Sequence, residues 1–163
     1  MNENLIGILS DTHDNRASIH RAVDLFNASG CSLVVHAGDY IAPFTAQEFE
    51  RLACPFLGVF GNNDGDKNGL RKAYEKVGSL YGPPHEFTHA GRRLVVMHET
   101  DYVDEYLARE DIVAVIFGHT HQIEVTAGKP LLLNPGECCS WITGRSTVMI
   151  LDLSTMEVRV KDV

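Results

Sequence analysis

The sequence lacks any hydrophobic run long enough to cross a membrane. Its longest apolar run covers residues 112–117, whereas a helix that crosses a bilayer needs roughly 20 apolar residues. The chain also opens on a strand-like run, without the charged and then apolar segments of a signal peptide. We therefore expect no membrane span and a cytoplasmic location.

Cysteine is scarce and shows no metal-binding or redox spacing. The four cysteines are Cys31, Cys54, Cys138 and Cys139, and none forms a CxxC pair. This pattern argues against a structural zinc site built from cysteines and fits a reducing compartment. We expect the adjacent Cys138 and Cys139 to be a packed or exposed pair, not a disulfide.

Basic residues are fewer than acidic ones. The sequence has 14 Lys and Arg against 22 Asp and Glu, for a formal net charge of -8. This balance argues against an extensive nucleic-acid surface but leaves a local anion site open. With 163 residues, 44% of them hydrophobic, the chain fits one globular domain, residues 1–163. The sequence does not determine the oligomeric state, and a homo-oligomer stays open.

Short apolar runs and helical patterns alternate along the first half of the chain. The runs cover residues 5–9, 33–35, 56–60, 94–97, 112–117 and 131–133, and such runs are typical of strands covered on both faces. Asn15 can cap a helix that ends at Gly30, and further helices are expected at 44–52, 70–77 and 103–109. A hairpin is expected around Ser154 and Thr155. We predict an α/β domain with two packed sheets, helices outside and a mostly antiparallel later part.

Polar segments follow the apolar runs: SDTHDN, HAGDY, GNND, HET, GHTH and NPGE. Ligands bind beyond the carboxyl ends of strands in α/β sheets, so five of these segments can converge. The candidate residues are Asp11, His13, Asp39, Asn62, His98, His119 and His121. Imidazole and carboxylate together favour borderline divalent ions. Seven ligands are too many for one tetrahedral ion but suit two ions that share a carboxylate. Each fragment alone is more often a capped turn or a surface histidine; the complete ordered set predicts a two-metal catalyst.

The ordered set DTH, GD, GNND, H and GHTH resembles the calcineurin-like metallophosphoesterase superfamily. SDTHDN, HAGD and NPGE resemble its small bacterial and archaeal phosphodiesterase branch, and the match runs from Asp11 to about Gly136. The resemblance implies a four-layer αββα sandwich, with two mixed β-sheets face to face and helices outside. It also implies a divalent-metal-dependent phosphodiesterase that attacks a small phosphate ester with a hydroxide activated by two ions.

The resemblance further implies a role for each candidate residue. One ion would be held by Asp11, His13 and His121, the other by Asn62, His98 and His119, with Asp39 bridging both. The catalytic residues would be Asp39, Asn62, Asn63 and His98. Manganese is the expected metal, and nickel, iron, zinc, cobalt or magnesium are alternatives, because ligand type alone does not select among them.

The chain departs from the family pattern at Asn63. Much of the superfamily has a histidine there, which is thought to contact the phosphate and protonate the leaving group. Asparagine can donate a hydrogen bond but cannot deliver a proton near neutral pH, so we expect phenolate leaving groups to be favoured over alkoxides. The arginine often found shortly after the bridging aspartate is also absent, since Tyr40 and Ile41 follow Asp39.

Other residues have two interpretations each. His36 either orients a metal ligand or is structural. His20, His85 and His89 are expected at the surface, the last two around a turn, and Cys138, Cys139 and Trp141 line the cleft or an interface. The alternative functions are a phosphomonoesterase on the same site and a non-catalytic scaffold with the same fold, as in a retromer subunit similar to this family. A scaffold would tolerate lost ligands, whereas all seven positions here have suitable residues.

Overall fold

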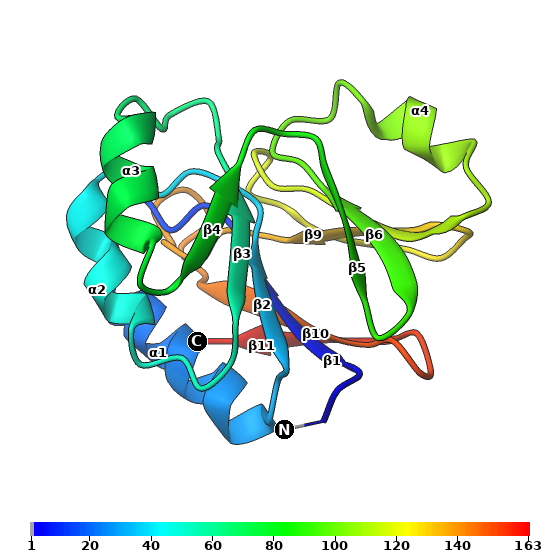
Figure 1. Ribbon diagram of the computed structural model, residues 1–163, viewed down its shortest axis with the longest axis horizontal. Coiled ribbons are helices and arrows are strands. Elements are labelled where there is room, and N and C mark those ends of the chain that lie inside the picture. The colour runs from blue at the N-terminus through cyan, green and yellow to red at the C-terminus, as the bar shows by residue number, and fades with distance from the viewer. Residues whose placement is uncertain (1) are drawn as a thin grey trace.

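The computed structural model describes residues 2–163, whose strands form two sheets (Figure 1). The first sheet has the order β11-β10-β1-β2-β3-β4 and the second β5-β6-β7-β9-β8. The first contains β1 (Leu5–Leu9), β2 (Leu33–His36), β3 (Phe56–Val59), β4 (Gly78–Tyr81), β10 (Thr147–Asp152) and β11 (Glu157–Asp162). The second contains β5 (His85–His89), β6 (Arg92–Val96), β7 (Ile112–Ile116), β8 (Ile123–Thr126) and β9 (Leu131–Pro135).

Both sheets are mixed, as predicted. Strands β1 to β4 are parallel, and the β10–β11 hairpin, predicted around Ser154 and Thr155, joins β1 in the antiparallel direction. The prediction of a mostly antiparallel later part was wrong for the centre of the second sheet. There β6, β7 and β9 are parallel, and only the edge strands β5 and β8 are antiparallel. The chain crosses over between these central strands, so their carboxyl ends lie at one edge of the sheet.

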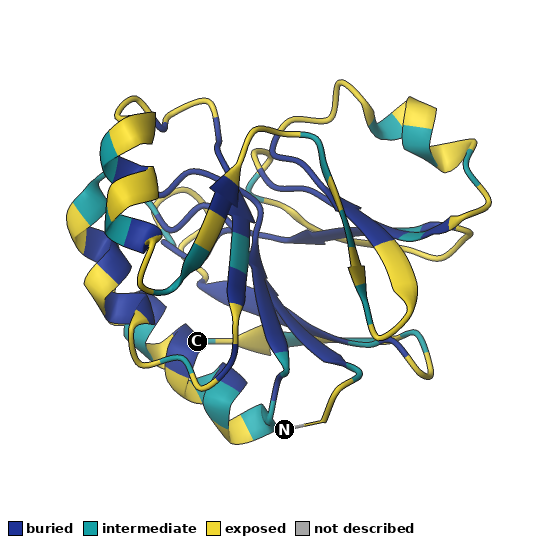
Figure 2. Ribbon diagram, in the orientation of Figure 1, coloured by how far each residue is buried: buried dark blue, intermediate teal, exposed yellow. Residues whose placement is uncertain are grey.

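The two sheets pack against each other, and helices cover their outer faces, which gives four layers. Helices α1 (Arg16–Ser29), α2 (Ala46–Phe49) and α3 (Lys67–Tyr74) cover the outer face of the first sheet, and the short α4 (Val103–Leu107) packs on the second (Figure 1). In β1, Ile6 and Ile8 face the second sheet, whereas Leu5 and Leu9 face the helices. Because both faces are covered, the whole strand is apolar and buried (Figure 2). This is the predicted four-layer arrangement.

The predicted helices differ from the observed ones mainly at their ends. The Asn15 side chain caps α1 by accepting from Ser18 N at 3.2 Å, and Gly30 ends the helix with φ 71°, as predicted. The helix expected at 44–52 is instead a 3₁₀ turn, η1 (Pro43–Thr45), followed by α2. The helix expected at 70–77 begins at Lys67, because the Asp66 side chain caps it there. Asp66 Oδ1 accepts from Gly69 N at 2.9 Å. The helix ends at Tyr74.

The sequence pattern did not predict β5 and β8, the edge strands of the second sheet. His85 and His89 lie at the ends of strand β5, so the expected turn there was wrong. The residues of β5 alternate between partly buried and exposed, and β8 is exposed throughout, so neither strand shows an apolar run. No helix among residues 2–163 is long and apolar enough to cross a membrane.

Candidate metal centre

The structure brings all seven candidate residues together at one edge of the two sheets. Asp11 and His13 follow β1, Asp39 follows β2 and Asn62 follows β3, whereas His98 follows β6 and His119 and His121 follow β7. The two sheets pack face to face with the carboxyl ends of these strands adjacent. Residues more than 100 positions apart in the sequence thus come within a few ångströms of one another.

The first group consists of Asp11, His13 and His121. His121 Nε2 lies 3.3 Å from Asp11 Oδ1, and His13 Nε2 lies 3.7 Å from the same oxygen. The Asp11 side chain is fully buried, and those of His13 and His121 are 19% and 10% exposed. The group is therefore largely enclosed.

The second group consists of Asn62, His98 and His119. Asn62 Oδ1 lies 2.9 Å from His98 Nε2 and 3.1 Å from His119 Nδ1. His98 is buried, with its Nδ1 2.7 Å from the Ala37 carbonyl oxygen. Asn62 and His119 are exposed, so this group is more open to solvent than the first.

Asp39 lies between the two groups. Its Oδ2 is 3.4 Å from His13 Nε2 of the first group and 3.4 Å from His98 Nε2 of the second. Asn63 donates to the same carboxylate from its backbone and from its side chain. This position is the one that a bridging ligand would need.

The backbone around these residues adopts an uncommon conformation. Five of the seven have a positive φ: Asp11, His13, Asp39, His119 and His121, with values from 36° to 67°. Residues other than glycine rarely adopt this conformation, and it costs roughly 1–3 kcal/mol each where a surrounding structure enforces it. Residues in this conformation cluster at functional sites, so their concentration at one edge supports a candidate site there.

The donor atoms fit divalent metal ions. Two ligands bound to one ion at about 2.1 Å lie roughly 3.0 to 3.4 Å apart at octahedral or tetrahedral angles. Five of the pairs described above lie 2.9 to 3.4 Å apart. In addition, Asp11 Oδ1 and His13 Nε2 are buried without a hydrogen-bond partner. Buried polar atoms without partners are rare in folded proteins, and a cation would satisfy both.

The charges at the centre also favour cations. Burial opposes the charge of Asp39, but His98 and Asn63 outweigh it and hold the pKa of that carboxyl well below its usual range. The Asp11 carboxylate raises the pKa of His13. Burial opposes the charged form of His98, but Asp39 and Asp11 outweigh it and raise its pKa. The buried carboxylates therefore create a negative potential that a cation would neutralise.

Asp64, the last residue of GNND, was not among the candidates, but it shapes the loop that presents Asp39. Its Oδ1 accepts from Tyr40 N and Ile41 N at 2.8 and 2.9 Å, and its Oδ2 accepts from Asp39 N and Gly61 N at 3.0 and 2.7 Å. This buried carboxylate thus fixes the backbone on both sides of Asp39. Its place directly after Asn62 and Asn63 was the available sequence signal.

Glu137, the last residue of NPGE, was also missed. Its Oε2 lies 2.8 Å from His121 Nδ1, and the side chain is fully buried. Burial opposes its charge, but the hydrogen bonds from Thr143 and His121 lower the pKa of Glu137 to about 2. Its segment was noted in the sequence as following a strand, and that placement was the available signal.

The side chains of His36 and Asn63 both form hydrogen bonds within the loops that carry the ligands. His36 is fully buried; its Nδ1 accepts from Gly38 N at 3.1 Å and its Nε2 lies 3.1 Å from Thr12 Oγ1. It therefore links the two loops that follow β1 and β2 and belongs to neither group. Asn63 is exposed, but its side-chain amide donates to Asp39, so one of its two N–H bonds is already used.

The remaining residues singled out in the sequence lie as follows. His20 is partly exposed beside Glu48, and His89 Nε2 lies 2.8 Å from Ser32 Oγ. All four cysteines are free and buried. Cys139 Sγ lies within 4.8 Å of the ring nitrogens of His13 and His121. Trp141 is 64% exposed, and its indole N–H donates to the His13 carbonyl oxygen at 3.1 Å.

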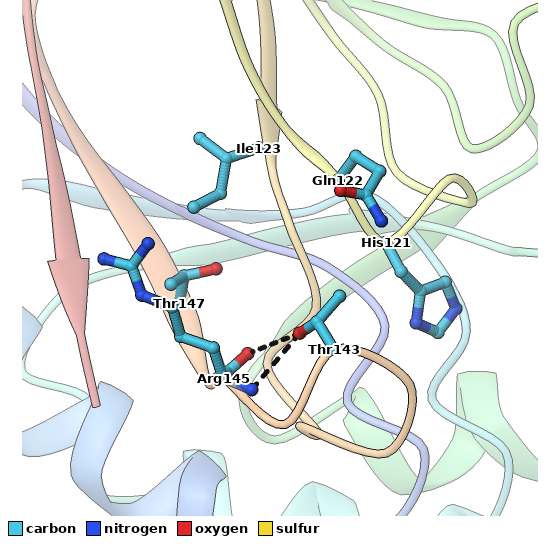
Figure 3. Close-up of a pocket in the computed structure, with 6 residues that line it drawn as sticks. All are labelled: His121, Gln122, Ile123, Thr143, Arg145 and Thr147. Carbon is cyan, nitrogen blue, oxygen red and sulfur yellow. Dashed lines mark hydrogen bonds between the residues drawn. The ribbon is translucent and has the colours of Figure 1, made fainter.

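A cavity of about 240 Å³ adjoins the first group. It is lined by His121, Gln122, Ile123, Thr143, Arg145 and Thr147 (Figure 3). The residues come from β10, from the loop that precedes it and from the segment that runs from His121 into β8. The hydroxyl of Thr143 accepts from Arg145 N at 3.2 Å, as Figure 3 shows. The loop from Glu137 to β10 therefore forms one wall beside His121.

The fold and much of the sequence recur in known proteins. The chain is 32% identical to a phosphodiesterase, MJ0936, from Methanocaldococcus jannaschii, over 94% of this chain and 96% of that protein. It is 34% identical to a probable metallophosphoesterase from Methanothermobacter thermautotrophicus, over 81% and 76%. A solved structure described as a novel archaeal phosphodiesterase superposes with a TM-score of 0.92 at 30% identity, over 98% of this chain and 99% of that one.

A family model described as the calcineurin-like phosphoesterase superfamily domain matches residues 5–156. The match begins with β1, includes every residue of the two groups and ends just before β11. Together with the two mixed sheets, this shows that the chain belongs to the calcineurin-like phosphoesterase superfamily of metal-dependent enzymes.

Proposed function

We propose that this chain hydrolyses small phosphodiesters with two divalent metal ions bound at the candidate centre. Asp11, His13 and His121 would hold one ion and Asn62, His98 and His119 the other. Asp39 would bind both. The observation that carries the proposal is the division of the seven residues into two groups that share the Asp39 carboxylate, whose Oδ2 lies 3.4 Å from a histidine of each group.

When bound, two such ions lower the pKa of a water molecule and neutralise charge on the phosphoryl oxygens. The chain's residues determine the charge around them. The positive charge of two divalent ions exceeds the negative charge of the two carboxylates, Asp11 and Asp39. Asn62 is neutral and does not reduce the difference. The centre can therefore attract a phosphate ester although the chain as a whole has a net charge of -8.

Asn63 has one N–H bond left for the substrate. A side-chain amide has two N–H bonds, and one of them is donated to Asp39. The other can be donated to a phosphoryl oxygen of a bound ester. Because the amide cannot release a proton near neutral pH, we propose that the leaving group departs without a proton from this position and that phenolates are favoured.

Two considerations support a diester over the alternatives. The relatives that match nearly the whole chain are named phosphodiesterases, whereas a phosphomonoesterase would use the same residues on an ester with one organic group. A non-catalytic scaffold would not need seven converging ligands with unpartnered buried atoms. We take residues 1–163 as one domain that acts in this way, with manganese as the expected metal.

The test is hydrolysis of bis-p-nitrophenyl phosphate and of p-nitrophenyl phosphate by chelated protein after manganese, nickel, magnesium or zinc is added back. We expect metal-dependent turnover of the diester to exceed that of the monoester. Asp39→Asn should abolish both. A folded protein without turnover with any of the metals would contradict the proposal and favour the scaffold, and a faster monoester would favour the phosphomonoesterase.

A further inference from the structure

The buried Glu137 carboxylate has hydrogen-bond partners at both of its oxygens. Its Oε2 lies 2.8 Å from His121 Nδ1 and accepts from Cys139 Sγ at 3.1 Å. Its Oε1 accepts from the backbone N–H groups of Ile142 and Thr143, and from Thr143 Oγ1 at 2.6 Å. The carboxylate is fully buried. Both oxygens are therefore satisfied, and the side chain is held in one place relative to His121.

This contact determines which nitrogen of His121 is free. Backbone N–H groups of Ile142 and Thr143 donate to both oxygens of this carboxylate. Glu137 is therefore arranged as an acceptor, and His121 Nδ1 has the proton and donates it to Glu137. The lone pair is then left on Nε2, which lies 3.3 Å from Asp11 Oδ1. Glu137 thus directs the unprotonated nitrogen of His121 toward the rest of the first group.

The segment 137–143 also contacts the other two residues of the first group. The backbone N–H of Cys139 donates to the Asp11 carbonyl oxygen at 3.0 Å. The indole N–H of Trp141 donates to the His13 carbonyl oxygen at 3.1 Å. One continuous segment, folded around the Glu137 carboxylate, is therefore bonded to all three residues of this group.

The second group has a different kind of support. His98 Nδ1 lies 2.7 Å from the Ala37 carbonyl oxygen, which is neutral. Within residues 2–163, no hydrogen bond joins the segment 137–143 to Asn62, His98 or His119. A substitution of Glu137 should thus alter the positions of the ligands in the first group and leave those of the second group nearly unchanged.

From these contacts we propose that Glu137 is a positioning residue for one metal site, because it fixes His121 with Nε2 free and anchors the segment that holds Asp11 and His13. This rests on the proposed function, since it takes Asp11, His13 and His121 as the ligands of one ion. A carboxylate behind a ligating imidazole increases the basicity of the ligand and fixes its orientation. The ion in the first group should therefore depend on Glu137, and the ion in the second group should not.

The experiment is a calorimetric titration of chelated protein with Mn²⁺. The steps of the wild-type protein are assigned with His121→Ala and Asn62→Ala, which should each remove a different step. In Glu137→Gln, affinity at the step lost in His121→Ala should fall roughly 10- to 100-fold, and the other step should change by less than about threefold. Asp162→Asn, a carboxylate-to-amide change at an exposed partner of Arg145, is the matched control and should bind like the wild type.

The outcomes separate the two proposals. A wild-type protein that binds no Mn²⁺ would overturn the proposed function and with it the role of Glu137. If the wild-type protein shows two steps and the Mn²⁺ affinities of both are unchanged in Glu137→Gln, the role of Glu137 is overturned and the proposed function stands. The same holds if both affinities fall equally.

If Glu137→Gln does not fold, the wild-type protein still provides a test. Histidine ¹⁵N NMR of the chelated protein, about two pH units above the ordinary imidazole pKa, reports which nitrogen of each neutral ring has the proton. We expect His121 protonated at Nδ1. A His121 ring protonated at Nε2 would overturn the proposal.

Discussion

Asn63 holds both oxygens of the Asp39 carboxylate. Its backbone N–H donates to Oδ1 at 2.9 Å, and its side-chain amide donates to Oδ2 at 2.7 Å. Asp39 Oδ2 is also the atom that lies between the two histidine-containing groups. The residue at position 63 therefore orients the proposed bridging ligand, in addition to its proposed contact with the substrate.

Replacing Asn63 by histidine should change the preference for leaving groups. A general acid contributes roughly 10²- to 10⁴-fold for poor leaving groups and little for good ones. In Asn63→His we expect the rate on a dialkyl phosphate, relative to bis-p-nitrophenyl phosphate, to rise at least roughly tenfold. Asn63→Ala, which removes the bond to Asp39 without adding an acid, should slow both substrates. An unchanged ratio in Asn63→His would show that the acid does not belong at this position.

Removing the Asp64 carboxylate should destabilise the protein. In Asp64→Ala the buried N–H groups of Asp39, Tyr40 and Gly61 lose their acceptor, and buried donors without partners cost roughly 1–3 kcal/mol. We expect the free energy of unfolding in urea to fall by about 3 kcal/mol. The control is Asp66→Ala, which removes an exposed helix cap and should cost about 1 kcal/mol. Equal losses in both variants would contradict the role given to Asp64.

The stability of the protein should depend on pH through His36. Complete burial lowers the pKa of His36 well below its ordinary value, so the folded state keeps the ring neutral. As pH falls below about 6.5, the unfolded chain binds a proton that the folded chain does not, and stability decreases. Stability is therefore fully present above that pH and is lost below it.

The measurement is urea unfolding of chelated wild-type protein and His36→Asn between pH 7.5 and 5.5. The asparagine oxygen can still accept from Gly38 N, but the side chain does not titrate. The wild type should lose about 1.4 kcal/mol more than the variant over this range. Parallel pH profiles would show that His36 titrates alike in both states.

Removing the metal should lower the melting temperature. An ion that binds only the folded chain adds about 2.7 kcal/mol at one hundred times its Kd, which is roughly 5–10 °C for a chain of this size. Thermal melts with Mn²⁺ and with excess chelator should differ by at least this amount. The double variant His121→Ala/Asn62→Ala should melt alike in both conditions, and a wild type indifferent to Mn²⁺ would argue against the centre.

Much of the site could be predicted from the sequence because its residues follow apolar runs. Asp11, Asp39 and His98 each come shortly after a buried strand, and neighbouring parallel strands end at the same edge. Local order along the chain was therefore enough to predict that they converge. The division into two groups was implied only by the resemblance to a family, because spacing does not specify which side chains meet across two sheets.

The sequence by itself determined the buried strands, the helix α1 with its Asn15 cap, and the candidate ligands, since these depend on residues close together in the chain. Only the tertiary structure decided the roles of Asp64, His36 and Glu137. A carboxylate or imidazole after a strand has the same local pattern whether it faces solvent or is buried. Glu137 is separated from His121 by a strand pair, and Asp64 from Asp39 by three elements. Their roles follow from burial and from hydrogen-bond partners in other loops, which come together only when the strands pair in the folded chain.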